Sequence, residues 1–539
     1  MKTISEIIIE FIKFLKIDTI FGIPGSNLDF LKYLSEDKVI KFIVNKDEKN
    51  SPYMAMGYTK SSNKISCCFG SVGAGVFNLI PGTISAYYES VPLLIIGGQT
   101  NLKNKGKNTF QEASGCARSV SQLNEFKKIT LYNCILNEKK LFQQLEKVFF
   151  SLNDFRSGPV YIEFPSELMN LKINFNKKIF CNMKINFNRY RLDKIKLYDE
   201  SKKVNQLIID LNKSKKPVIL IGNGVKDSKE IIKLSSKFRI PIFSTFKGKD
   251  RVTNNFKYYM GCLGLIGSSI GNNYFKESDL LISIGSSLSQ FTTDNWKLID
   301  NKNIYRIDTI NDDITKHKGI VIKSDYSDVF KKLLSSDYKG NNNIVELKQS
   351  IDNELNKFNS PKINLIRKLR TSLSKDSIIV TEDIFLIGKY FKFYKNDINL
   401  NFTNIAPIGC ALSGGIGAQI ANSKKKVIVI LGDGGFNMNI SELNTIMNYK
   451  IPLKIILINN NGYGIVYKSQ IHKFKNNFYT QFKNPDYFKL SQSYNFTAYN
   501  INNVFKLSLK KLKKIINSNK TELINVKVDI DEKIGIKIY

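Results

Sequence analysis

Short apolar runs that alternate with longer amphipathic segments are the feature that most restricts the fold of this chain. The runs are rich in Ile, Val and Leu, and several end at a glycine before a stretch long enough for a helix. Apolar strands separated by crossover helices are typical of parallel sheets that are covered on both faces. The pattern therefore predicts an α/β protein built from doubly wound parallel sheets.

The alternation falls into three blocks, and three domains agree with a length of 539 residues, which exceeds what one hydrophobic core usually holds. We expect a first domain over residues 1–171, a second over 197–335 and a third over 351–539, with a Lys- and Asn-rich linker over 172–196. The strands that the apolar runs predict are Thr19–Gly22, Ile65–Phe69, Leu93–Ile96, Val160–Phe164, Val218–Ile221, Ile242–Ser244, Leu280–Ile284, Ile304–Ile307, Ile378–Thr381, Val427–Leu431 and Ile455–Asn459.

The formal net charge of +34 raises the question of nucleic-acid binding. Lysine is spread along the whole chain and is not gathered into basic blocks with interleaved aromatic residues. Arginine, which reads bases and phosphates better than lysine does, is scarce. We therefore expect a solvated lysine-rich surface and no nucleic-acid partner.

Cysteine, histidine and apolar patterning restrict the remaining classes. The 7 cysteines form no C-x-x-C pair and the 2 histidines are His317 and His472, so a zinc site or a histidine-centred triad has little to build on. An odd number of cysteines indicates reduced thiols in the cytoplasm. No apolar run reaches the ~20 residues that span a bilayer. Charged residues interrupt Ile7–Leu15, which predicts no signal peptide but a first helix that a Thr3/Glu6 capping box begins.

Polar residues follow two apolar strands of the third block at the point where each strand ends. The strand Val427–Leu431 is followed directly by a Gly-Asp-Gly-Gly turn. After a helix-like stretch comes the strand Ile455–Asn459, which is followed directly by Asn-Asn-Gly. In a parallel sheet these ends lie at one edge, where ligands of open α/β sheets bind. A carboxylate, an amide oxygen and a nearby carbonyl suit an octahedral Mg2+ that also takes phosphate oxygens. The glycines would let the backbone approach a diphosphate closely.

This order of a GDG turn, a helix and an NN segment resembles the fingerprint of thiamine-diphosphate enzymes. The resemblance implies that Asp433, Asn460 and the backbone carbonyl of Gly462 bind the Mg2+. The glycines that it places beside the diphosphate are Gly432, Gly434 and Gly435. A GDG sequence alone is also explained by an Asx turn after a strand. The prediction therefore depends on the GDG and NN segments occurring together at this spacing.

A segment of the first block resembles the same family. Lys46–Tyr58 is similar to the family's RHE…MADGYAR segment, and Glu48 stands at the position of the glutamate that protonates the aminopyrimidine ring of the cofactor. Without the match of the surrounding residues to this segment, a glutamate between two lysines would be interpreted as a charged residue on the surface. The resemblance thus implies a catalytic Glu48.

Further cofactor contacts are implied by short segments in the same order as in the family. Residues 21–25 resemble its FGIPG, residues 71–78 its SGPG loop with alanine in place of proline, and residues 408–409 its MG pair. The apolar residue of that pair wedges between the two cofactor rings in the family. The residues implied are Pro24, Gly73, Asn78 and Ile408.

From about Phe21 to the C-terminus, the sequence resembles acetolactate synthase-like enzymes. It implies a pyrimidine-binding, a middle and a diphosphate-binding domain. The implied reaction is decarboxylation of a 2-oxo acid, pyruvate being the first candidate, with carboligation of the resulting enamine to an acceptor carbonyl. Phe110 and Gln111 match the substrate segment, with Gln111 as a candidate catalytic contact. A homodimer or homotetramer is implied, in which Glu48 of one subunit serves the cofactor of the other.

Two departures concern the substrate, and two open points concern the cofactors. Phe291 stands where acetolactate synthases have an arginine for the acceptor carboxylate, and Ser469 stands at their acceptor-selecting tryptophan. We expect an acceptor without a carboxylate and a larger, more polar pocket. The family's diphosphate contacts have no counterpart in Thr381–Lys389. FAD in the middle domain stays open, since Gly222–Gly224 fits a simple βα turn better than a nucleotide loop.

Other functions stay open at this point. A decarboxylase that only protonates the enamine, and a lyase acting on an acyl-CoA or sulfonated substrate, belong to the same family. An inactive cofactor-binding scaffold is the alternative outside enzymes, and the Asp433, Asn460 and Glu48 set argues against it.

Overall fold

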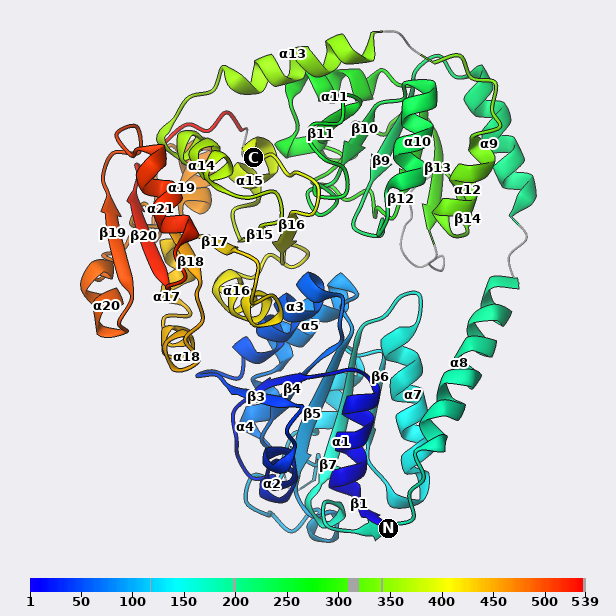
Figure 1. Cartoon of the computed structure of the whole chain (residues 1–539), viewed down its shortest axis with the longest axis vertical. Coiled ribbons are helices and arrows are strands. Elements are labelled where there is room, and N and C mark those ends of the chain that lie inside the picture. Colours follow the sequence, from blue (N-terminus) through cyan, green and yellow to red (C-terminus); the bar gives the residue numbers. More distant parts are fainter. Residues whose placement is uncertain (117, 197–199, 309–318, 341–342, 537–539) are drawn as a thin grey trace.

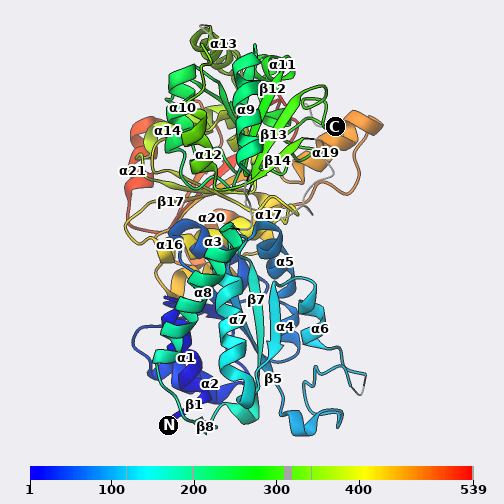
Figure 2. The ribbon, with the colours of Figure 1, turned by 90° about the vertical axis from the view of Figure 1, so that its right-hand side faces the viewer.

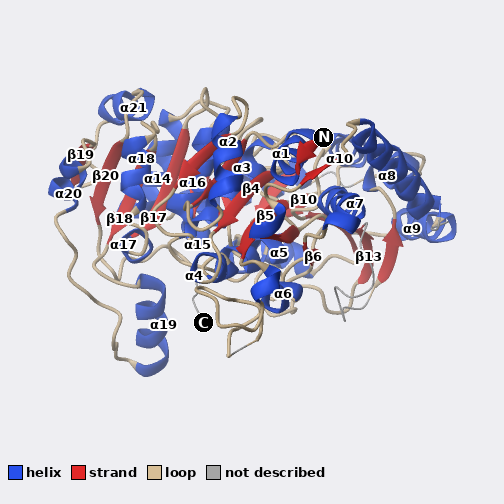
Figure 3. Cartoon of the chain, turned by 90° about the horizontal axis from the view of Figure 1, so that it is seen from below, coloured by secondary structure: helices blue, strands red, loops and turns tan. Residues whose placement is uncertain are grey.

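The computed structural model describes residues 1–116, 118–196, 200–308, 319–340 and 343–536, so His317 lies outside the described part. Three six-stranded sheets form three α/β units along the chain (Figure 1). The pairings within these sheets are parallel, and helices lie on both faces (Figure 3). The predicted α/β class with three parallel-sheet domains is confirmed.

The first unit contains the sheet of spatial order β3-β2-β4-β5-β7-β6. Its strands are β2 (Thr19–Gly22), β3 (Lys41–Val44), β4 (Ser66–Gly70), β5 (Leu93–Gln99), β6 (Tyr132–Ile135) and β7 (Pro159–Pro165), with a small antiparallel pair β1 (Lys2–Thr3) and β8 (Lys172–Ile173). Its helices are α1 (Ile4–Phe14), α2 (Leu28–Glu36), α3 (Asn50–Ser62), α4 (Ala74–Phe77), α5 (Ile80–Glu89), α6 (Gln122–Lys127), α7 (Leu141–Asn153) and α8 (Lys178–Lys196).

The second unit contains the sheet of order β11-β10-β9-β12-β13-β14. Its strands are β9 (Pro217–Ile221), β10 (Ile242–Ser244), β11 (Tyr259–Cys262), β12 (Leu280–Ile284), β13 (Asn303–Asp308) and β14 (Ile320–Lys323). Its helices are α9 (Ser201–Lys213), α10 (Lys229–Phe238), α11 (Ser269–Lys276), α12 (Tyr326–Leu333) and α13 (Ile344–Asn356).

The third unit contains the sheet of order β16-β15-β17-β18-β20-β19. Its strands are β15 (Ile378–Thr381), β16 (Ile398–Asn401), β17 (Val427–Gly432), β18 (Lys454–Asn459), β19 (Thr497–Ile501) and β20 (Glu522–Lys527). Its helices are α14 (Pro361–Ser372), α15 (Ile384–Tyr390), α16 (Cys410–Ala421), α17 (Asp433–Asn437), α18 (Glu442–Asn448), α19 (Gly464–Phe474), α20 (Tyr487–Ser493) and α21 (Leu509–Asn517).

The sequence predicted the start of the first unit correctly but not the segment that follows its last strand. The capping box at the start of α1 is confirmed, because the Thr3 hydroxyl accepts from the Glu6 amide and the Glu6 carboxylate accepts from the Thr3 amide. The linker expected over 172–196 is wrong for most of its length. Helix α8 fills it and packs on α7 with Phe180, Met183 and Phe187 in the core, before it leads to the second unit (Figure 1).

The expected start of the third domain at residue 351 falls inside α13. Ile344 and Ile351 of this helix pack in one cluster with residues of the second sheet, and α13 contacts α11. Among the described residues, no helix has the length and apolar character needed to cross a bilayer.

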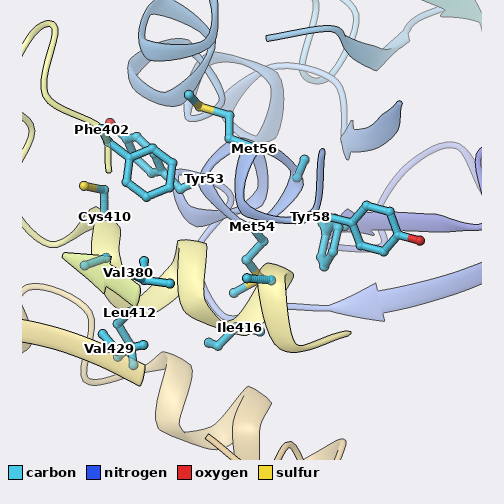
Figure 4. Close-up of a cluster of buried hydrophobic side chains, with 14 of the residues drawn as sticks. Tyr53, Met54, Met56, Tyr58, Val380, Phe402, Cys410, Leu412, Ile416 and Val429 are labelled. Atoms are coloured by element: carbon cyan, nitrogen blue, oxygen red, sulfur yellow. The ribbon is translucent and has the colours of Figure 1, made fainter. Parts of the chain in front are cut away.

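Helices α3 and α16 cross at close range and join the first unit to the third (Figure 4). A Cβ at Gly57 would overlap the Gly414 carbonyl oxygen, and a Cβ at Gly417 would overlap that of Met54. Apolar side chains of both helices and of both sheets surround the crossing, so a single core cluster spans the two units (Figure 4). Only glycine permits so short a distance between two helix backbones.

A buried ion cluster lies where the three units meet. The Glu89 carboxylate of α5 accepts from Lys60 at 2.6 Å and from Lys247 of the second unit at 2.8 Å, and its side chain is 1% exposed. Lys60 also donates to the Asn401 carbonyl at the end of β16. In side view this junction lies between the lower unit and the two upper units (Figure 2).

Candidate active site at the edges of two sheets

The carboxyl edge of the third sheet carries Asp433. Strands β17 and β18 are adjacent and parallel, so the residues that follow them meet at this edge as expected. Asp433 is 1% exposed, and its Oδ1 accepts from the Gly434 amide at 3.0 Å. Burial raises the pKa of Asp433, against hydrogen bonds from Asn484 and from the backbone amides of Asn461, Gly434 and Gly462. The buried carboxylate thus lies against the turn that follows β18.

Asn460 supplies an unpaired oxygen at the same edge. Its Oδ1 is buried and has no hydrogen-bond partner among the described residues. A buried amide oxygen without a donor costs free energy unless a ligand pairs with it. Asp433 and Asn460 therefore fit the oxygen donor set of a divalent cation. The described residues contain no group of three His, Cys, Asp or Glu side chains that could hold a metal, so a site of the zinc type is not formed there.

Asn484, which the sequence did not single out, orients this group. Its Nδ2 lies 2.7 Å from Asp433 Oδ2, 3.0 Å from Asn459 Oδ1 and 3.1 Å from Asn461 Oδ1. Its own Oδ1 accepts from the Tyr487 hydroxyl at 2.8 Å. Asn484 lies in the segment that follows α19, far from both motifs in sequence, and no spacing pattern identified it.

Of the glycines around Asp433, Gly432 ends β17, and Gly434 and Gly435 lie in the first turn of α17. A Cβ at Gly434 would meet the Tyr463 ring and one at Gly435 would overlap Glu382 Oε2, whereas a Cβ at Gly432 would meet nothing within 4 Å. Glu382 lies in the segment where the family's diphosphate contacts could not be placed. It is half-buried and accepts from the Ala411 amide at 2.7 Å, and desolvation raises its pKa. The chain itself thus places a carboxylate at the start of α16.

The carboxyl edge of the first sheet carries Glu48. Its Oε2 accepts from Asn78 Nδ2 at 3.1 Å, and its Oε1 lies close enough to Gly75 that a Cβ there would come within 3.3 Å. A cavity of about 580 Å3 opens beside it, lined by Lys46–Lys49, Phe77, Asn78, Pro81 and Ser441. Glu48 is half-buried, and Asn78 is exposed.

Glu442 of α18 fixes the segment that bears Glu48. Its Oε1 accepts from the Lys46 amide at 3.1 Å and from Asn50 Nδ2 at 2.9 Å. It is fully buried, and burial raises its pKa. The third unit therefore holds both ends of the short turn between β3 and α3.

Four further predicted residues lie near α4. Gly73 has a φ of 78°, which favours glycine, and a Cβ on it would come within 3.6 Å of Gln111. Gln111 is exposed, with a φ of 61°, and Phe110 beside it is 86% exposed. Pro24 is exposed in the loop after β2, whose neighbour Ser26 donates its amide to Ser71 Oγ at 3.1 Å. These residues face the same edge of the sheet as Glu48.

Comparisons with known proteins agree with this arrangement of three units. Residues 2–117 match the model described as "Thiamine pyrophosphate enzyme, N-terminal TPP binding domain", residues 204–333 match its central domain and residues 385–526 its C-terminal TPP binding domain. The chain belongs to the thiamine pyrophosphate enzyme family. The family predicted from the sequence is thereby confirmed.

Curated relatives of this thiamine pyrophosphate enzyme cover nearly all of it. A probable acetolactate synthase large subunit of Methanococcus aeolicus is 28% identical, over 97% of this chain and 92% of its own. The acetolactate synthase large subunit of Lactococcus lactis is 27% identical, over 98% and 93%. That of Haemophilus influenzae is 25% identical, over 99% and 96%. The likeness extends over the whole architecture at a low level of identity.

The remaining site predictions lie at different places in this thiamine pyrophosphate enzyme. Ile408 precedes α16 with 52% of its surface exposed. Ser469, on α19, donates to the Ile465 carbonyl at 3.0 Å. Phe291 lies between the second and third units, with its ring 5.6 Å from that of Phe385. Gly462 pairs with Gln481 in an isolated bridge.

The glycines at residues 222–224 serve packing between two loops. A Cβ at Gly222 would overlap the Gly285 carbonyl oxygen, and one at Gly224 would lie 2.7 Å from the Gly285 Cα. This close approach agrees with the interpretation of the segment as a simple turn.

Proposed function

We propose that this chain catalyses a thiamine-diphosphate- and Mg2+-dependent decarboxylation of a 2-oxo acid, followed by carboligation of the decarboxylated fragment to an acceptor carbonyl. The buried, unpaired Oδ1 of Asn460 beside the buried Asp433 carboxylate carries the proposal. The relatives named acetolactate synthase large subunit support the reaction class, and pyruvate is the first candidate donor.

Asp433, Asn460 and the Gly462 carbonyl would hold the Mg2+ through hard oxygen atoms. The metal would also take two oxygens of the diphosphate. The glycines within residues 432–435 support this binding site. A side chain at Gly434 would overlap the Tyr463 ring, and one at Gly435 would overlap Glu382 Oε2. When bound, the cofactor supplies an electron sink for the charge left by loss of CO2.

Glu48 would exchange a proton with the aminopyrimidine ring. The Asn78 amide donates to the Glu48 carboxylate, which orients it, and Glu442 fixes the turn that carries it. Gln111, which lies against Gly73 at the start of α4, would contact the reacting carbonyl. These assignments rest on the resemblance and on the grouping of the residues around one sheet edge.

Two copies of the chain would complete each site. Asp433 and Asn460 do not line the cavity beside Glu48 in this chain. Exposed apolar side chains flank the Asp433 edge, namely Ile408, Met438, Ile465 and Val466, which are 43–52% exposed. Helix α19, which carries the last two, has no buried residue and projects from the body (Figure 3). Large apolar surfaces of this kind are typical of protein interfaces, so Glu48 of one copy would serve the cofactor held by the other, in a homodimer or a homotetramer.

The acceptor would lack a carboxylate. Phe291 cannot form the bidentate pair that an arginine makes with a carboxylate, and its ring packs against Phe385. Ser469 in place of a tryptophan would leave more room. An aldehyde or a keto-sugar fits these features.

A screen of pyruvate with and without aldehyde acceptors, in the presence of Mg2+ and thiamine diphosphate, tests the proposal. We expect CO2 release in the wild type, a mixed product when an aldehyde is present, and loss of turnover with the cofactor still bound in Glu48→Gln. Rapid conversion of pyruvate alone to acetolactate would contradict the acceptor assignment. Release of free acetaldehyde at the same rate with and without acceptor would identify a simple decarboxylase instead.

A further inference from the structure

A second cavity lies between the second and third units, away from both sheet edges described above. Its walls come from β11 and α13 of the second unit and from α14, the end of α15 and the segment after it in the third. It has a volume of about 230 Å3. Neither Glu48 nor Asp433 lines it. We call it the inter-domain cavity.

Cationic side chains dominate the lining of the inter-domain cavity. Asp352 is the one carboxylate among the lining residues, and it pairs with Lys348 at 2.8 Å and lies 3.9 Å from Lys392. Outside the lining, Asp397 pairs with Arg370 at 2.8 Å. The cations that line the cavity are Lys249, Lys348, Arg367, Arg370, Lys389 and Lys392. Within the lining, one carboxylate therefore faces six cations.

Two of these ammonium groups are buried and donate to backbone carbonyls. Lys249 is 2% exposed and donates to the Gly388 carbonyl at 2.7 Å, and Lys389 is 9% exposed and donates to the Gly535 carbonyl at 2.7 Å. Neither forms an ion pair with a carboxylate in the described part of the chain. Burial lowers the pKa of Lys249, and the charges of Lys348 and Lys392 add to this effect. Buried charges are ordinarily paired.

An unused donor is present as well. Arg370 is 7% exposed, and its Nε has no hydrogen-bond partner among the described residues although its terminal nitrogens are paired. Unpaired donors that line a cavity together with excess positive charge favour an anion as the missing partner.

We propose that the inter-domain cavity binds a compact, multiply charged anion of the phosphate type. Its volume of about 230 Å3 is below the ~300–1,000 Å3 of sites for drug-sized ligands, which excludes a dinucleotide. Arginine and lysine together match phosphate oxygens by planar forks and by point charges. The bound anion contacts both units, so it strengthens the docking of the second unit on the third.

Calorimetry and thermal unfolding with inorganic phosphate test this site. The protein is saturated with thiamine diphosphate and Mg2+ so that the diphosphate site is filled, and chloride at matched ionic strength is the reference. We expect saturable binding and a rise of the unfolding midpoint with phosphate concentration. A parallel titration with citrate decides the ligand class, and tighter binding of citrate than of phosphate overturns the phosphate assignment.

Two variants and one control locate the binding. Lys392 is exposed, so Lys392→Gln should fold and should bind phosphate about tenfold more weakly, as expected for loss of a charged partner. Lys249→Met should weaken binding at least as much. Lys395→Gln, an exposed lysine three positions along that does not line the cavity, should bind like the wild type. Absence of saturable binding, or equal binding by all variants, overturns the proposal.

Discussion

Replacing Glu89 by glutamine removes a buried carboxylate that two lysines from different units share. The exposed fraction of the Glu89 side chain is 1%, and those of Lys60 and Lys247 are 17% and 14%. Burial alone would raise the pKa of Glu89, but the two ammonium groups outweigh it and the pKa is lowered. In Glu89→Gln both lysines lose their buried partner, and the pKa of Lys247, which burial lowers to about 8, falls further because Glu89 no longer raises it.

The expected cost is about 3–5 kcal/mol, the range found when one partner of a buried ion pair is removed. For a transition that involves one unit of 150–250 residues, this lowers the unfolding midpoint by on the order of 10 °C. Because Lys60 and Lys247 come from different units, the loss should affect the docking of the units first. The first calorimetric transition is therefore expected to move.

Differential scanning calorimetry of wild type and Glu89→Gln at pH 7 measures this shift. Asp328→Asn is the matched control, since its pair with Lys331 lies at the surface, with 68% and 59% of the side chains exposed, and such pairs contribute about 0–1 kcal/mol. A shift for Glu89→Gln no larger than that of the control would refute the reasoning that a buried carboxylate joins the units.

Three other predictions follow from the packing, the charge and the site. Gly417→Ala should destabilise the protein by about 1–3 kcal/mol in urea unfolding, despite the better helix propensity of alanine, because its Cβ overlaps the Met54 carbonyl; unchanged stability would contradict the close crossing. Burial lowers the pKa of Lys454 from 10.5 to about 8, so the folded state disfavours its charged form. The cost of burying this charge is present in full below pH ~8, and the free energy of unfolding should rise between pH ~8 and ~10.5 as the folded protein holds the neutral form. Lys454→Met should show a smaller rise of the urea midpoint over that window, and an equal rise would contradict it. Asn484→Ala should raise the Mg2+ concentration needed for half-maximal cofactor binding by about 10–100-fold, since it removes the donor to Asp433; an unchanged requirement would remove Asn484 from the site.

Most of the central strands were predictable because they are buried on both faces, although β20, which is also central and buried, was missed. The limits of β2, β10, β12 and β15 agree with the apolar runs. Edge strands such as β3, β6 and β14 were missed because they are only partly buried, so their apolar pattern is interrupted. Helix α8 was mistaken for a linker because Lys and Asn dominate its composition. The spacing of Phe180, Met183 and Phe187 was the signal for a helix with one buried face.

The residues of the candidate site also fall into those that the sequence identified and those that only the structure revealed. Asp433, Asn460 and Glu48 belong to contiguous motifs, so the sequence alone singled them out. Asn484 and Glu442 lie in segments without a motif, and only the fold brings them to Asp433 and to the turn before α3. Contacts between segments that are distant in sequence leave no spacing pattern to read.

The rate of hydrogen–deuterium exchange at the thiazolium C2 of bound thiamine diphosphate tests the central claim most directly, because it requires no knowledge of the substrate. The account predicts fast exchange in the wild type and exchange at least ~100-fold slower in Glu48→Gln with the cofactor still bound, as expected for loss of a general acid–base group. Asp433→Asn should fail to retain the cofactor at the same Mg2+ concentration. Wild-type exchange in Glu48→Gln, or undiminished cofactor binding in Asp433→Asn, would contradict the assignment.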